Sequence, residues 1–185
     1  PKMHVLARII LLPSIATIVC AVVLSKSLNL HRLKERLWVG IWAGAVATAT
    51  LDVVRLTGFH LGLMPGNMPR MFGVLILNRM ALGPNVFSDV IGYLYHYWVG
   101  ACFGLTLTLL FGAVRWQAGL VWGILIEIGM MTTPPMVVAM DTGYFGLKQG
   151  YGLLVVSFTA HVVYGIFLGL LLQKHTHYKG SFLHL

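Results

Sequence analysis

Five long stretches of the chain are almost uninterruptedly apolar. They cover roughly residues 5–25, 38–58, 86–112, 117–140 and 151–173. An α-helix that crosses a bilayer needs about 20 predominantly apolar residues, so each stretch is long enough to span a membrane. The pattern therefore predicts an all-α integral membrane protein with five transmembrane helices, folded as a single membrane domain over residues 1–185.

The composition agrees with this prediction. Hydrophobic residues make up 58% of the chain and charged residues only 10%, which is more apolar surface than a soluble domain of this size would bury. The formal net charge is +8. Basic residues at the ends of membrane helices usually meet anionic lipid, so we expect membrane lipids as partners, bound lipid included, and no nucleic acid.

Two of the stretches carry the same series of side chains at intervals of four residues. The series are Gly92, His96, Gly100 and Gly104, and Ser157, His161, Gly165 and Gly169. Four-residue spacing places side chains on one face of a helix. Each of these helices therefore presents a face of small residues that carries one imidazole, and small residues let membrane helices approach closely.

The two preceding stretches show the same spacing without the histidine. They carry Gly40, Gly44, Thr48 and Asp52 in one, and Gly119, Gly123 and Glu127 in the other. This pattern predicts tandem helical hairpins, at about 38–112 and 117–173, which share one orientation and form a pseudo-symmetric four-helix bundle. The stretch 5–25 lacks such a stripe and should lie at the periphery.

The connection over residues 59–85 contains a shorter apolar run. The run 71–82 is bracketed by Pro65, Gly66, Pro69, Gly83 and Pro84. It is too short to span a membrane, which favours an interfacial or re-entrant helix.

Charge next to the helices predicts how they are oriented. The loop after the first stretch carries Lys26, Arg32, Lys34 and Arg36, and basic loops are retained in the cytoplasm. Five spans then place the basic tail, residues 174–185, in the cytoplasm and the N-terminus outside. We interpret the first stretch as a retained helix because the segment 25–27 is a poor signal-peptide cleavage site.

His96 and His161 are the main candidates for chemistry. They occupy equivalent positions of the two repeats and could face each other across the bundle. Two facing imidazoles with glycines beside them could ligate a haem b. The alternative is that each imidazole bonds a nearby carbonyl, Glu127 or Thr159, since polar groups inside a membrane usually find a partner in the bundle interior. The cofactor is otherwise undetermined.

Three charged residues lie within the apolar stretches. Asp52 and Arg55 are three residues apart, which predicts an ion pair on one helix face. Glu127 has no helical partner, so it is protonated, bonded to a histidine across the bundle, or exposed to water. A carboxyl group close to two histidines could relay protons.

The fourth long stretch ends in Thr132-Thr133-Pro134-Pro135. Pro134 and Pro135 predict a kink, because proline removes a backbone donor. Methionines cluster at positions 64, 68 and 71, within the 59–85 connection, and again at 130, 131, 136 and 140. Thioethers can bind Cu(I), but packing is the simpler interpretation, and we assign no metal site. The histidines of the tail are expected to be solvated.

Residues 37–173 resemble a family of small, uncharacterised bacterial multi-pass membrane proteins. The resemblance rests on the glycine-rich helix with an Ala-Thr run at 43–48 and on the helices with a histidine followed by glycines, at 96–104 and 161–169. The resemblance implies a four-helix architecture in a bacterial inner membrane. It does not imply any particular activity. The nucleophile elbow, phosphate loop, HExxH and dinucleotide fingerprints are missing from the sequence.

These observations favour a non-catalytic accessory or structural subunit of a larger membrane complex, such as a respiratory or redox complex. The stretch 5–25 or the 59–85 connection would contact the other subunits. An electron-transfer protein with haem b on His96 and His161 is the second hypothesis. A small proton-coupled carrier or channel, using Glu127 and the kink at Pro134, is the third.

Overall fold

The computed structural model describes residues 2–139 and 141–180, without the side chains of Pro135 and Ala139. This part of the chain is helical and forms no strand; a single antiparallel bridge joins Gly112 and Lys179. The prediction of an all-α protein is therefore confirmed. In chain order the elements are α1 Met3–Leu6, η1 Ala7–Leu11, α2 Leu12–Ser27, α3 His31–His60, α4 Met68–Ile76, α5 Val86–Phe111, α6 Trp116–Thr132, η2 Pro135–Ala139, η3 Tyr144–Gln149 and α7 Tyr151–His175.

Four helices of the described chain are long and apolar enough to cross a membrane, by length and composition. They are Met3–Ser27, which joins α1, η1 and α2, together with α3, α5 and α7. These helices contain the predicted stretches 5–25, 38–58, 86–112 and 151–173, apart from a residue at the end of α5. The stretch 117–140 differs, because its helix α6 has only 17 residues.

The chain leaves the α-helical conformation at Thr133, directly before Pro134. Thr133 is extended, with φ −77° and ψ 149°, as steric conflict with the proline ring favours for the preceding residue. The hydroxyl of Thr133 donates to the carbonyl oxygen of Met130 at 2.9 Å, which satisfies one of the carbonyls freed at the helix end. The predicted kink is thus a full break, after which Pro135 begins the separate turn η2.

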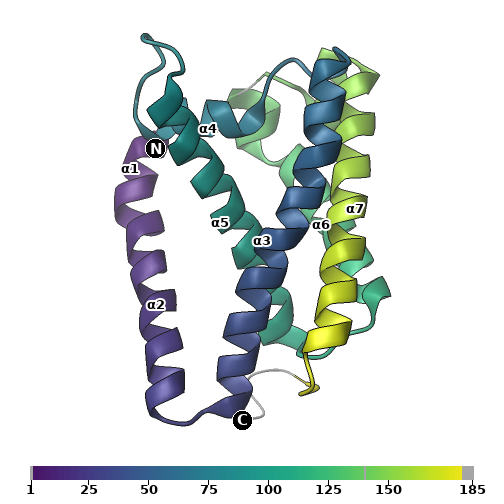
Figure 1. Ribbon diagram of the computed structural model, residues 1–185. Coiled ribbons are helices and arrows are strands. Elements are labelled where there is room, and N and C mark those ends of the chain that lie inside the picture. Colours follow the sequence, from purple (N-terminus) through teal and green to yellow (C-terminus); the bar gives the residue numbers. More distant parts are fainter. Residues whose placement is uncertain (1, 140, 181–185) are drawn as a thin grey trace.

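Two antiparallel helix pairs form the body of the protein (Figure 1). In one pair α3 packs on α5, and in the other α6 packs on α7, while α3 also packs on α7. Two hydrogen bonds join the pairs: the Tyr164 hydroxyl donates to the Gly100 carbonyl at 2.8 Å, and the Trp122 indole donates to the Phe103 carbonyl at 3.1 Å. The short helix α4 covers the first half of α5.

The glycines lie where the paired helices approach most closely. A side chain at Gly44 would collide with the backbone of Gly100 and Ala101, and one at Gly123 with the backbone of His161 and Gly165. The same kind of contact within a pair occurs at Gly40, Gly100, Gly104, Gly119, Gly165 and Gly169. Gly92 differs, because it faces the carbonyl of Pro69 in α4. These glycines are the contact surfaces of the helices.

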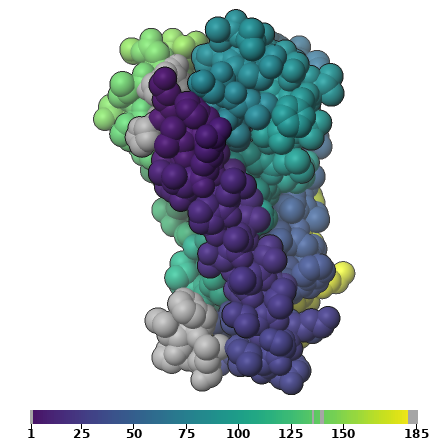
Figure 2. All heavy atoms as spheres, turned by 90° about the vertical axis from the view of Figure 1, so that its left-hand side faces the viewer, coloured from purple at the N-terminus to yellow at the C-terminus, as the bar shows by residue number. Residues whose placement is uncertain are grey.

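The N-terminal helix, Met3–Ser27, stands apart from the two pairs. None of its most apolar segment is buried, and in Figure 2 it forms a ridge on the face of the molecule. It connects to α3 through a short turn in which Asn29 has a positive φ of 53°, a conformation that asparagine tolerates better than most residues. It is a peripheral element with a large exposed apolar surface.

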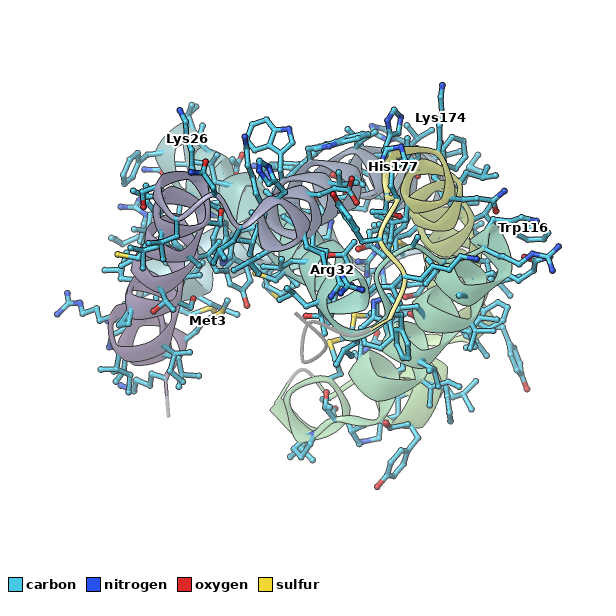
Figure 3. The ribbon with its side chains drawn as sticks, turned by 90° about the horizontal axis from the view of Figure 1, so that it is seen from below. Met3, Lys26, Arg32, Trp116, Lys174 and His177 are labelled. Atoms are coloured by element: carbon cyan, nitrogen blue, oxygen red, sulfur yellow. The ribbon has the colours of Figure 1, made fainter. Side chains whose placement is uncertain are left out.

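The tail after α7 is anchored at the basic end of the molecule. Glu35 accepts hydrogen bonds from the backbone N–H and the Nδ1 atom of His177, both at 2.8 Å. Arg36 donates to the Gly180 carbonyl at 2.6 Å, and Arg32 donates to the Lys179 carbonyl. Figure 3 shows His177 and Arg32 at this end. His177 is thus paired with Glu35, while its side chain stays 76% exposed, as expected for a solvated histidine of the tail.

Candidate functional site

Two carboxylate–imidazole pairs lie buried inside the helix pairs. Asp52 of α3 contacts His96 of α5, with 3.0 Å between Oδ1 and Nε2. Glu127 of α6 contacts His161 of α7, with 2.7 Å between Oε2 and Nδ1. The exposed fraction is 1% for Glu127 and 9% for His96. Each helix pair therefore contains one acid and one base that water barely reaches.

The helix register explains why both histidines lie at the same level. His96 is ten residues after Val86, the first residue of α5, and His161 is ten residues after Tyr151, the first residue of α7. At a rise of 1.5 Å per residue, both lie about 15 Å from their helix starts. Both helices begin at the same end of the molecule (Figure 1). The glycines that follow each histidine bring the partner helix close enough for its carboxylate to reach the ring.

The two rings use different nitrogen atoms toward their carboxylates. In His161, Nδ1 lies 3.0 Å from the Ser157 carbonyl as well as 2.7 Å from Glu127. A carbonyl can only accept a hydrogen bond, so Nδ1 carries a proton and Nε2 is the atom that can gain or lose one. In His96 the Asp52 carboxylate contacts Nε2. The atom of His96 that can gain or lose a proton is therefore Nδ1. The Ser157 hydroxyl donates to Glu127 at 3.0 Å.

Arg55 is the third charged residue of this cluster. It is 7% exposed and interacts electrostatically with both Glu127 and Asp52. Its Nε atom, Oδ2 of Asp52 and Oε1 of Glu127 are buried without a hydrogen-bond partner. Asp52 contacts His96 at 3.0 Å, and Arg55 interacts electrostatically with Asp52, as the sequence predicted, and also with Glu127.

The charges of the cluster do not balance unless a proton is added. If both carboxylates are ionised, they and the guanidinium carry a single net negative charge in a buried environment, where an unbalanced charge is costly. One proton on either imidazole would then make the cluster neutral. The arrangement can therefore hold one proton at either of two alternative positions.

A cavity of about 180 Å³ lies between the two helix pairs. Arg55, His96 and His161 contribute its polar lining, and much of the rest is apolar or aromatic: Leu51, Phe72, Tyr95, Val99, Phe103, Ile126, Met130 and Tyr164. Pockets that hold drug-sized ligands are usually 300–1,000 Å³. The cavity suits a single ring or a few waters.

A haem b between His96 and His161 does not fit this geometry. Axial ligation through both rings would use their Nε2 atoms, and Nε2 of His96 is engaged by Asp52 at 3.0 Å. The cavity between the rings is also too small for a macrocycle. The partners of the two imidazoles are the carboxylates of Asp52 and Glu127.

Sequence reasoning identified His96, His161 and Glu127 as a group, and the structure brings them together with Asp52 and Arg55. It did not pair Asp52 with His96. The available signal was that Asp52 continues the four-residue stripe of Gly40, Gly44 and Thr48, which faces α5. The methionines form a separate apolar cluster, which contains Met64, Met68, Met131 and Met136.

Comparison with known proteins gives one match. The model of a family described as a family of unknown function (DUF6789) matches residues 34–180. Neither a curated protein nor a solved structure matches the chain. The matched segment contains all five charged or imidazole residues of the site, and the N-terminal helix lies before it.

Proposed function

Because the chain belongs to this family of unknown function, we propose its activity from the site: a small membrane protein that binds and passes on a proton, as a proton relay or proton-coupled carrier. The observation that carries the proposal is the pair of buried carboxylate–imidazole contacts, Asp52–His96 and Glu127–His161, on either side of Arg55. Ionisable residues inside membrane helices commonly mark proton or substrate pathways.

The charge balance supports a specific mode of action. A proton on His96 neutralises the cluster, and so does a proton on His161, but protons on both leave an excess positive charge. The two positions therefore compete for one proton. Histidine suits this role because its unperturbed form changes charge between pH 5 and 8. The cavity beside both rings gives water or a small solute access to the atoms that exchange protons.

The proposal includes a five-span topology. Helix α6 is about 26 Å long at 1.5 Å per residue, close to the hydrocarbon thickness of about 30 Å, and η2 can extend it. The tandem hairpins α3–α5 and α6–α7 then share one orientation. The end that carries Lys26, Lys34, Arg115 and Lys174 is cytoplasmic by the charge rule, so the C-terminus is cytoplasmic.

One observation favours a second function, that of a subunit in a larger membrane complex. The N-terminal helix has no buried residue in its most apolar segment and precedes the family match at residue 34. Within a bilayer such a helix can face lipid or another subunit. The two functions are compatible, since a proton-binding bundle can serve a larger assembly.

The proton function can be tested in vesicles that contain the purified protein and a pH-sensitive dye. With an imposed potassium diffusion potential, the wild-type protein should carry protons into the vesicles. Because both imidazoles are required, the double variant His96→Ala/His161→Ala should fall to the level of protein-free vesicles. The matched control is Asp89→Asn, which breaks a more exposed ion pair with Arg70 (3.1 Å) and should retain the wild-type rate. Equal rates for the wild type and the histidine variant would overturn the proposal.

A further inference from the structure

A large groove separates the N-terminal helix from α4 and α5. Its volume is about 850 Å³, and its apolar lining includes Leu11, Leu12, Ile15, Ile76, Ile91 and Leu94. A second hollow of about 310 Å³ lies along the same helix and is lined by Ile10, Ser14, Cys102 and others. Figure 2 shows the ridge of the N-terminal helix that bounds both. Such a groove can hold a long apolar chain.

A single row of α5 side chains separates these grooves from the central cavity. Tyr95 lines both grooves and the cavity, while Val99 and Phe103 line the smaller groove and the cavity. Phe72 of α4 packs edge-on against Tyr95, with 5.4 Å between ring centroids. Side-chain rotation in this row would open a lateral route from the groove to the buried cluster.

The chemistry inside the cavity fits an uncharged ring that carries oxygen atoms. The aromatic rings of Phe72, Phe103 and Tyr164 line it, and the side chain of Arg55 contributes to the lining beside them. The imidazoles of His96 and His161 can accept or donate a proton there. A fatty acid would bring a further negative charge to a buried cluster that already contains the carboxylates of Asp52 and Glu127.

We propose that the protein binds a lipid-soluble quinone or quinol, with its ring in the central cavity and its chain in the groove beside the N-terminal helix. This inference rests on the proposed proton function, because the ring oxygens, carbonyl in a quinone and hydroxyl in a quinol, would be the hydrogen-bond partners of the two imidazoles that hold the proton; no electron transfer is part of the proposal. It assigns the N-terminal helix a role as one wall of the binding site.

The test is equilibrium binding of decylubiquinone to the purified, delipidated protein, with bound quinone quantified after gel filtration. The wild-type protein should retain quinone stoichiometrically. Val99→Trp should abolish retention because it fills the row between groove and cavity, and Arg55→Gln should weaken it because a shorter, uncharged side chain replaces the guanidinium. Val90→Trp is the matched control on α5, since Val90 is 51% exposed and lines neither the two grooves nor the cavity; it should bind like the wild type. Thermal unfolding in detergent establishes that each variant is folded.

Retention that is equal in the wild type, Val99→Trp and Arg55→Gln would show partition into bound detergent and would overturn the inference. Absence of retention by the wild type would overturn it as well. If Val99→Trp does not fold, the milder Val99→Phe replaces it, with a partial loss expected. Proton flux in vesicles is measured separately: flux without quinone binding refutes only the ligand, and quinone binding without flux refutes only the proton function.

Discussion

Glu127→Ala is expected to destabilise the folded bundle by about 3–5 kcal/mol, the range for breaking a buried ion pair by removing one partner. Glu127 contacts the Nδ1 atom of His161 at 2.7 Å and accepts a hydrogen bond from the Ser157 hydroxyl at 3.0 Å. It is also one of the two carboxylates that offset the buried charge of Arg55. The substitution removes the carboxylate that the Ser157 hydroxyl, the His161 imidazole and the Arg55 guanidinium interact with in the core.

The measurement is reversible unfolding in mixed detergent micelles. Glu127→Gln, which keeps the size and one acceptor oxygen, should lose less than Glu127→Ala. The double variant Glu127→Ala/Arg55→Met removes a charge of each sign, so it should be more stable than the sum of its single losses predicts. If the two single losses simply add, Arg55 and Glu127 are not coupled and the electrostatic description of the cluster is wrong.

The second large effect is expected at the contact between α6 and α7. Gly123→Leu should prevent the pair from forming or cost about 3 kcal/mol or more, the upper end for overpacked cores. The added side chain would collide with the His161 carbonyl and the Gly165 backbone, and backbone atoms cannot move aside as a flexible side chain can. Moving α6 away would also separate Glu127 from His161.

Gly129→Leu is the matched control for this prediction. It lies on the same helix, and no heavy atom lies within 4 Å of a Cβ built there. Replacing glycine by leucine in a helix should stabilise it by up to about 1 kcal/mol. The readouts are the yield of monodisperse protein and the thermal midpoint in detergent. Similar results for both variants would mean that helix contact at the glycines does not hold the pair together.

Local periodicity predicted much of this structure. Four-residue spacing placed Gly44 and Gly100, and Gly123 and Gly165, on contacting faces, and it located both histidines on those faces. Hydropathy predicted the four long helices. These features depend on residues within one helix, where sequence distance and spatial distance correspond directly.

Contacts between distant parts of the chain could not be predicted from local patterns. The three-residue spacing of Asp52 and Arg55 suggested a local ion pair and gave no sign that Asp52 contacts the imidazole of His96, 44 residues away. Glu35 pairs with His177 across 142 residues, which no local pattern indicates. The break at Thr133 is a local effect: a kink was predicted at Pro134 and Pro135, and the conformation that Pro134 favours in Thr133 ends helix α6 there.

The central claim is that His96 and His161 compete for one proton, and ¹⁵N NMR of the protein with ¹⁵N-labelled histidine, in lipid nanodiscs, tests it most directly. The ring signals are assigned with His96→Gln and His161→Gln and then followed between pH 8 and pH 5, where histidine ordinarily changes charge. The account predicts that both rings become partly protonated over the same pH range and that together they take up a single proton. Each single variant should increase the protonated fraction of the remaining ring. Two rings that remain neutral throughout, or that each take up a full proton without regard to the other, would contradict it.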